Sequence, residues 1–185
     1  MSKPSRSKKA SGFDDIVKIA NASSQGKKTV LRSISAQRKA YKVPSWFSKL
    51  PTGSHGNTPS QKKAWKVVSD YVRERDWKKY MGFCADGCGT RIEDWHNGDC
   101  GHYLAWASCN GLFKYELTNL VLQASNCNRR SDGVIGHGLG EELKRRYNDG
   151  HLDWIGLENK KYHGKKIEEW ELVEMVARLR PDLVK

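Results

Sequence analysis

The sequence has few hydrophobic residues and no long hydrophobic run. Hydrophobic residues make up 37% of the 185-residue chain. No apolar segment is long enough to span a bilayer or to serve as the hydrophobic region of a signal peptide. We therefore expect a protein that works inside the cell without a membrane partner. Its length allows one domain of ordinary size plus tails, or two small domains.

Acidic residues are scarce at the start of the chain, where residues 1–45 contain only Asp14 and Asp15. The same segment holds eleven Lys and Arg residues, so about three quarters of the net charge of +12 lies there. A segment so basic, rich in Ser and poor in aromatic residues, buries too little apolar surface to fold alone. It is typical of a flexible arm that neutralises phosphates, and we expect it to contact DNA. The alternative is a solvated tail that only aids solubility.

Residues 46–59 are rich in Pro, Gly and Ser and are typical of a linker. A helix is expected over residues 60–80, because the stretch from Thr58 to Gln61 offers a capping box with Pro at the first helical position. Apolar residues at helical spacing follow this stretch. The helix would pack on the rest of the domain.

The remaining chain divides into a loop-rich core and a helical end. Residues 81–137 are short and punctuated by Gly, with strands expected at 101–107 and 120–123. Residues 138–185 form a C-terminal helical segment, with helices expected at 139–148 and 166–180.

All five cysteines lie within residues 84–127. In a reducing compartment this points to metal ligands or free thiols before disulfides. Cys84 and Cys88 flank a Gly-containing turn, as in a zinc knuckle, where thiolates converge on one tetrahedral ion. Cys127 is a third candidate for such a structural zinc site.

The fourth ligand of that site is not evident from the sequence. Ala124 occupies the position three residues before Cys127, where a second thiolate would complete the pair. The fourth ligand must therefore be Cys100, Cys109, a His, or absent. For Cys109 we favour a small buried hydrophobe.

The stretch NGDCGHYLAW, residues 97–106, contains a candidate for acid–base chemistry. A neutral His102 can accept a proton from water at physiological pH, as phosphodiester hydrolysis requires. Asp99 and Asn128 are oxygen ligands suited to a hard cation that stabilises the developing charge. In a regular strand Asp99 and His102 point to opposite faces, so a bulge at Gly101 would be needed to bring them together. The alternative for His102 is a surface or packing histidine.

The order of these motifs closely resembles the NinG family of phage recombination proteins, also called Rap. The resemblance rests on the segments AWKVVSDYVRERD, CADGCG, DCGHY and FKYELTNLVLQASNCN. It covers residues 60–135, with a weaker echo in the segment WELVEMVARL. The chain departs from the family at Ala124, where the family has Cys, and at Cys100, where a small residue is common. More distantly it is similar to endonuclease VII and other His-Me finger (HNH) nucleases.

The resemblance implies an α+β fold, with a small zinc-stabilised ββα-metal (His-Me finger) nuclease core flanked by helices and preceded by the basic arm. It implies a phage-encoded enzyme of the host cytoplasm that cleaves branched DNA, such as Holliday junctions and D-loops. The cofactors would be catalytic Mg²⁺ (or Mn²⁺) and structural Zn²⁺.

The resemblance also implies roles for particular residues. His102 would be the general base, and Asn119 the asparagine that braces the finger loop. Asp99 and Asn128 would bind the catalytic ion. Zinc would be held by Cys84, Cys88 and Cys127, with Cys100 as the uncertain fourth ligand. The expected DNA contacts are Arg129, Arg130 and Lys114, with solvated side chains as the alternative for the arginine pair.

Two other functions fit the same sequence. One is a sequence-specific HNH nicking or homing-type endonuclease, and the other is a non-catalytic zinc-stabilised DNA-binding protein. All three require DNA. A homodimer would suit the cleavage of symmetric junctions, with the helix carrying Trp170 as the interface, although its apolar stripe is more often ordinary core.

Overall fold

The computed structural model describes residues 41–130 and 138–184. The chain divides into two units, Met1–Lys42 and Val43–Lys185, and nearly all of the described residues lie in the second. The basic arm therefore lies almost wholly outside the described residues. Within the described ranges, no helix has the length and apolar character needed to cross a membrane.

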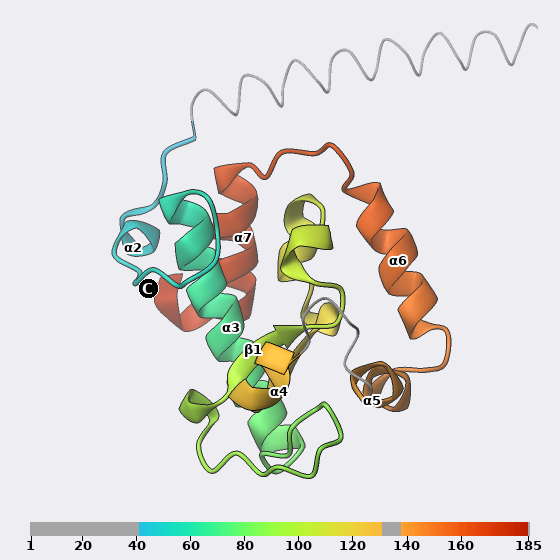
Figure 1. Cartoon of the computed structure of the whole chain (residues 1–185). Coiled ribbons are helices and arrows are strands. Elements are labelled where there is room, and N and C mark those ends of the chain that lie inside the picture. Colours follow the sequence, from blue (N-terminus) through green and yellow to red (C-terminus); the bar gives the residue numbers. More distant parts are fainter. Residues whose placement is uncertain (1–40, 131–137, 185) are drawn as a thin grey trace, which may run out of the picture. The chain divides into compact units, whose positions relative to one another are not determined.

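The second unit is a mixed α+β fold (Figure 1). Its described helices are α2 (Ser45–Ser48), α3 (Pro59–Lys79), α4 (Ser125–Arg130), α5 (Leu139–Arg146), α6 (His151–Lys161) and α7 (Glu169–Leu179). Its two described strands are β1 (Asp99–His102) and β2 (Leu120–Gln123). Short 3₁₀ turns connect them, at Trp95–Asn97, Trp106–Ser108, Gly111–Tyr115 and Leu117–Asn119, and another, Pro181–Val184, follows α7.

Helix α3 is the central element, and its start follows the capping signal in the sequence. Thr58 Oγ1 accepts a hydrogen bond from the backbone N–H of Gln61 at 3.2 Å. The Gln61 side chain accepts from the backbone N–H of Asn57 at 2.7 Å, one residue before the cap. These bonds satisfy amide groups at the helix start that have no partner within the helix.

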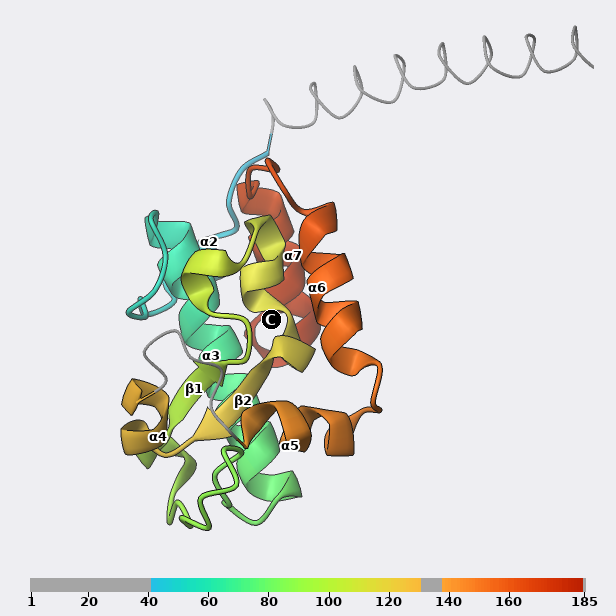
Figure 2. The ribbon, with the colours of Figure 1, turned by 45° about the vertical axis from the view of Figure 1, so that its right-hand side comes forward.

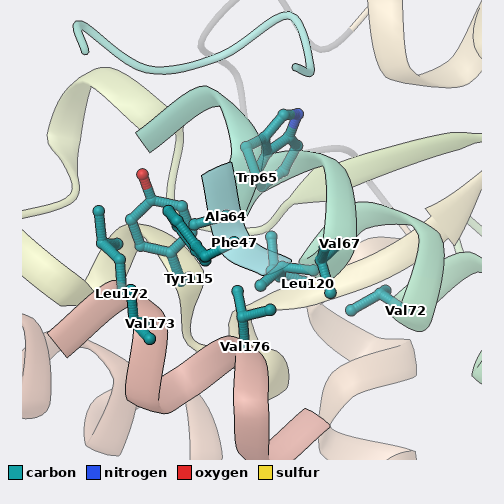
Figure 3. Close-up of a cluster of buried hydrophobic side chains, with 11 residues drawn as sticks. Phe47, Ala64, Trp65, Val67, Val72, Tyr115, Leu120, Leu172, Val173 and Val176 are labelled. Carbon is teal, nitrogen blue, oxygen red and sulfur yellow. The ribbon is translucent and has the colours of Figure 1, made fainter. Parts of the chain in front are cut away.

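The main hydrophobic core lies between α3 and α7 and reaches β2 (Figure 3). Figures 1 and 2 both show α7 alongside α3. The fully or almost fully buried side chains of this cluster are Phe47, Ala64, Trp65, Val67, Val68, Val72, Tyr115, Leu120, Leu172, Val173 and Val176. Phe47 is 0% exposed, so the segment expected to be a linker contributes to the core.

The two strands form an antiparallel pair with a regular register. Asp99 is opposite Gln123, and His102 is opposite Leu120. Figure 2 shows the strands in front of α3, with α4 beside them. Helix α4 begins at Ser125, two residues after β2 ends, so the chain forms a strand–strand–helix unit on one side of α3.

A second core cluster is built by α5, α6 and the loop after β1. Its buried members are Ala85, Cys109, Phe113, Val121, Leu139, Leu143 and Ile155. Asn159 of α6 is also buried, and its side chain binds that loop through the backbone N–H of Asn110 at 2.7 Å and the carbonyl of Ser108 at 3.0 Å.

A buried charged network joins α5 to α3 and β2. Asp76 is 1% exposed and accepts hydrogen bonds from Arg146 Nη1 at 2.6 Å, Arg75 Nε at 2.7 Å and the backbone N–H of Leu122 at 3.0 Å. The Arg146 guanidinium also lies 3.7 Å from the centre of the Tyr80 ring. This carboxylate therefore fixes three elements together.

The observed helices agree with the sequence at α3, α5 and α7, within a few residues at each end. Strand β2 begins and ends where the sequence predicts, whereas β1 ends at His102 rather than extending to residue 107. Helix α6 was not expected. Its sequence, HLDWIGLENKK, does carry apolar residues at helical spacing, but Gly150 and Gly156 obscure the pattern.

Candidate functional site

Three cysteines converge after α3. The Sγ atoms of Cys84, Cys88 and Cys127 all lie within 4.8 Å of one another. The turn at residues 85–87 brings Cys88 back toward Cys84, with Gly87 at φ 71°, and β2 leads directly into α4, which carries Cys127. The thiols could hold a metal such as zinc, since clustered thiolates are its preferred ligands. The sequence prediction for these three residues thus agrees with the structure.

The pKa values of the three thiols in this group differ. Burial acts against ionisation of Cys88, but hydrogen bonds from Thr90 and the neighbouring cysteines lower its pKa to about 7. Burial and the hydrogen bond to Cys88 raise the pKa of Cys127 to about 12. Burial also raises the pKa of Cys84, opposed by a hydrogen bond from the backbone N–H of Ala124 at 3.2 Å. One thiolate therefore forms near neutral pH, and a bound cation would favour the others.

Cys100 and Cys109 lie outside the three-cysteine group. Cys100 packs against the core cluster beside α3, where burial raises the pKa of its thiol. Its nearest charges belong to α3, among them Arg73 and Asp76. The structure therefore does not bring Cys100, the uncertain fourth ligand, into the three-cysteine group, because strand alternation turns it toward α3. Cys109 is 4% exposed and donates from Sγ to the Leu104 carbonyl at 3.1 Å, in keeping with a buried structural role.

The candidate ion ligands Asp99 and Asn128 are in contact. Asn128 Nδ2 donates to Asp99 Oδ2 at 3.2 Å, joining α4 to β1. The Gln123 side chain lies beside them over Gly101: a Cβ atom added at Gly101 would lie 1.6 Å from Gln123 Oε1 and 3.1 Å from Asn128 Oδ1. Gln123 is 1% exposed, and its Nε2 has no hydrogen-bond partner among the described residues. The side chains of Asp99, Gln123 and Asn128 form a compact group of one carboxylate and two amides. We call this group the oxygen cluster.

His102 ends β1 and is held by aromatic rings. Its ring stacks on Trp65 at 5.1 Å between centroids and meets Trp106 edge-on at 5.6 Å. Its Nε2 lies 3.0 Å from the carbonyl oxygen of Lys114. Because a carbonyl can only accept, Nε2 carries the proton and Nδ1 carries the lone pair.

The charge state of His102 follows from this packing. Burial, together with the nearby charges of His55 and Lys114, lowers its pKa to about 4, against the opposing effect of the hydrogen bond to the Lys114 carbonyl. The imidazole is therefore neutral at physiological pH.

Asn119 braces the loop that follows β1. Its side chain is 0% exposed, accepts from the backbone N–H of Leu104 at 2.8 Å and donates to the Leu104 carbonyl at 3.2 Å. Its backbone carbonyl accepts from the N–H of Tyr103 at 3.0 Å. Asn119 thus acts through the loop rather than at a reacting atom, which makes it a positioning residue.

The bulge at Gly101 that would bring Asp99 and His102 together is not present, since Gly101 pairs regularly with Val121, and the two side chains therefore point to opposite faces of β1. Asp99 contacts α4, whereas His102 contacts Trp65 of α3. A groove of about 300 Å³ nevertheless lies between these regions. It is lined by Gly53, Ser54, His55, Trp65, Lys66, Ser69, Arg73, Gly98, Asp99, Cys100 and Asn128. The candidate ion ligands and the ring that stacks on His102 therefore border one opening.

The three expected DNA contacts differ in their surroundings. Lys114 turns inward: its Nζ donates to the Trp106 carbonyl at 2.9 Å and lies 4.7 Å from the Trp106 ring centre. This ammonium therefore packs against the Trp106 ring that also contacts His102. Arg129 is exposed on α4. The Arg130 side chain lies outside the described part of the chain.

Two residues of this region escaped the sequence analysis. The sequence did offer a signal for Gln123, because it is the polar residue that ends the otherwise apolar strand LVLQ. In the structure every residue of this strand is buried. His55 lies in the segment GSHGN, which the composition marks only as a turn. Its place in the groove depends on packing against α3 and could not be inferred from that pattern.

Comparison with known proteins identifies the family. The model described as "Bacteriophage Lambda NinG protein" matches residues 18–183, which include the three-cysteine group, both strands and helices α3 to α7. No curated protein and no solved structure gives a significant match. The chain therefore belongs to the NinG family of bacteriophage proteins.

Proposed function

We propose that this protein is a metal-dependent endonuclease of the His-Me finger (HNH) type that cleaves branched DNA during phage recombination. The observation that carries the proposal is the contact between Asp99 of β1 and Asn128 of α4. Asp99 lies three residues before His102, the neutral histidine that ends β1. The strand–strand–helix unit carries an oxygen-ligand pair on one face of β1 and an imidazole base on the other, and these are the groups that phosphodiester hydrolysis requires.

The oxygen cluster suits a hard cation. Asp99 offers a carboxylate, and Asn128 and Gln123 offer amide oxygens, which match the ligand preference of Mg²⁺ or Mn²⁺. A bound ion would stabilise the negative charge that develops on the phosphate and the leaving oxygen.

The chain's own residues supply the remaining steps. His102 Nδ1 takes a proton from the attacking water as the new O–P bond forms. The Lys114 carbonyl holds the imidazole in the tautomer with the lone pair on Nδ1. Asn119 fixes the loop that carries Trp106 and so maintains the packing of the His102 ring. The bond to the 3′ oxygen breaks, which leaves a 5′-phosphate and a 3′-hydroxyl after that oxygen takes a proton from solvent.

The metal of the three-cysteine group has a structural role in this proposal. Helix α4 has six residues, which is too short to be stable alone. Zinc bound by Cys84, Cys88 and Cys127 would anchor this helix and with it Asn128, which directly follows Cys127. The basic arm and Arg129 would add affinity through DNA phosphates without sequence preference, so binding should weaken steeply with salt.

The test compares the unaltered protein with His102→Ala and Asp99→Ala on a four-way junction and on linear duplex, with Mg²⁺ or Mn²⁺. We expect junction cleavage by the unaltered protein and loss of cleavage in both variants, with junction binding retained. Cleavage by His102→Ala at the unaltered rate would contradict the catalytic assignment. Recurrent cuts at one sequence of the linear duplex would instead indicate a sequence-specific HNH enzyme.

One observation favours a second candidate, a non-catalytic DNA-binding protein stabilised by zinc. His102 packs between aromatic rings, as a purely structural histidine would. That function predicts tight junction binding and no cleavage with either metal ion. In that case His102→Ala would lower stability and leave no activity to compare.

A further inference from the structure

The loop at residues 53–57 is fixed on α3 by close backbone contacts. The backbone N–H of Gly53 donates to the Lys62 carbonyl at 2.8 Å. A Cβ at Gly53 would lie 2.9 Å from Trp65 Cδ1, so only glycine allows this approach. Gly56 has φ 122°, a conformation that residues with side chains rarely adopt. The loop therefore presents His55 from a defined backbone position.

His55 contacts the same indole rings as His102. Its ring centroid lies 5.1 Å from that of Trp65 and 5.2 Å from that of Trp106. Its Nδ1 lies 2.8 Å from Ser54 Oγ. Partial burial lowers its pKa below the ordinary value. A neutral ring whose Nδ1 accepts from the Ser54 hydroxyl carries its proton on Nε2, which is then a hydrogen-bond donor.

Asp99 and Asn128 line the same groove as His55. The other basic residues of the groove are engaged elsewhere. Arg73 Nη1 donates to the carbonyls of His96 at 3.3 Å and Gly98 at 3.1 Å, and its Nη2 pairs with Asp70. Lys66 also pairs with Asp70. His55 is thus the groove residue best suited to contact an incoming anion.

We propose that His55 binds the scissile phosphodiester of DNA, with Nε2 donating a hydrogen bond to a non-bridging phosphate oxygen in the groove that Asp99 and Asn128 also line. The proposal rests on the nuclease function proposed above and gives the groove its substrate contact. A phosphate that contacts both His55 and a cation held by the oxygen cluster would be bound at two points, which favours one orientation for attack.

The first test measures cleavage of a four-way junction by His55→Gln, His55→Leu and a matched control, His163→Ala, which removes an exposed histidine after α6. Glutamine retains an amide donor, whereas leucine retains bulk without a donor. We expect kcat/KM to fall roughly 10- to 100-fold in His55→Leu, the range for loss of one hydrogen bond to a charged group. His55→Gln should recover part of this loss, and His163→Ala should match the unaltered protein.

The second test does not require cleavage. The pKa of His55 is measured by NMR on the full chain, alone and saturated with junction DNA in the presence of Ca²⁺ or EDTA. Contact with a phosphate stabilises the imidazolium, so the pKa of His55 should rise by about one unit or more, while that of His163 should rise less. Circular dichroism and thermal melting of each variant show whether it is folded.

The outcomes separate the two proposals. Full activity in folded His55→Leu, or a His55 pKa unmoved by saturating DNA, overturns the role of His55. Cleavage abolished in His102→Ala with His55 variants unaffected supports the nuclease and overturns this contact. If the unaltered protein cleaves nothing, the nuclease proposal fails. In that case, a rise in the pKa of His55 on DNA binding would still support a phosphate contact by His55. An unchanged pKa would overturn the contact as well.

Discussion

The Nε2 atom of His102 lies 3.0 Å from the carbonyl oxygen of Lys114, so the position of this imidazole is set by a residue twelve places along the chain. The contact fixes the tautomer, and the burial that accompanies it keeps the ring neutral. Both properties are measurable without any substrate.

Acid should destabilise the protein through His102. Its pKa is about 4 in the folded state, below the ordinary value of 6.5. The unfolded chain therefore binds a proton that the folded state excludes, and stability falls as pH drops from about 6.5 toward 4. The expected loss is about 2 kcal/mol between pH 7 and pH 4.5. Urea unfolding at both pH values should show this loss in the unaltered protein and a smaller one in His102→Gln; equal losses would contradict it.

Replacing Asn119 by Asp should weaken the loop after β1. The carboxylate keeps the size of the side chain and the acceptor for Leu104 N–H, but it removes the donor to the Leu104 carbonyl and buries a charge. We expect a fall of about 1–3 kcal/mol in the free energy of unfolding. Junction cleavage should fall as well, because Trp106 and His102 lose their fixed positions. Unchanged stability together with unchanged cleavage would show that the Asn119 side chain does not hold the loop after β1 in place.

Adding a thiol at Ala124 should strengthen zinc binding. The backbone N–H of Ala124 lies 3.2 Å from Cys84 Sγ, which places this residue beside the three-cysteine group. Ala124→Cys would supply a fourth thiolate, as expected for tetrahedral zinc. Titration with Co²⁺, followed by back-titration with Zn²⁺, should show stronger sulfur-to-metal absorption and tighter binding in this variant. Cys100→Ala, the control, should bind as the unaltered protein does.

Outside the candidate site, the buried ion pairs of Asp76 should contribute more to the free energy of unfolding than the exposed ion pairs do. Asp76→Asn removes the charge that pairs with Arg146 Nη1, while the Arg146 side chain, which is 2% exposed, keeps only its pair with Glu142. Loss of one partner of a buried ion pair costs about 3–5 kcal/mol. Glu74→Gln removes the partner of Lys78 in a more exposed pair on the same helix and should cost less than about 1 kcal/mol. Chemical unfolding of both variants tests the difference, and similar losses would contradict it.

The sequence predicts those features whose signals are local. The helix start at Thr58 and the strand Leu120–Gln123 follow from short patterns of caps and apolar residues. The three cysteines could be named because knuckle spacing is a property of the chain itself. The alternation along β1 already placed Cys100 and His102 on one face.

The rest of the site depends on packing between distant segments. No pattern near Cys100 indicates that α3 covers its face of β1, which is what removes it from the three-cysteine group. Likewise, the position of His55 depends on its contact with Trp106, which lies 51 residues further along the chain. Helix α6 was hidden because its stability comes from burial of Ile155 and Asn159 against other elements.

The close approach of Gln123 to Gly101 has a consequence for recognising this site in other proteins. Any side chain at residue 101 would have to displace the buried amide of Gln123 beside Asp99 and Asn128. The oxygen cluster therefore requires a glycine at this position. The pattern that defines the cluster is then Asp-x-Gly-His followed downstream by Gln-x4-Asn, and it contains no cysteine. A relative that has lost every zinc ligand can be recognised by this signature.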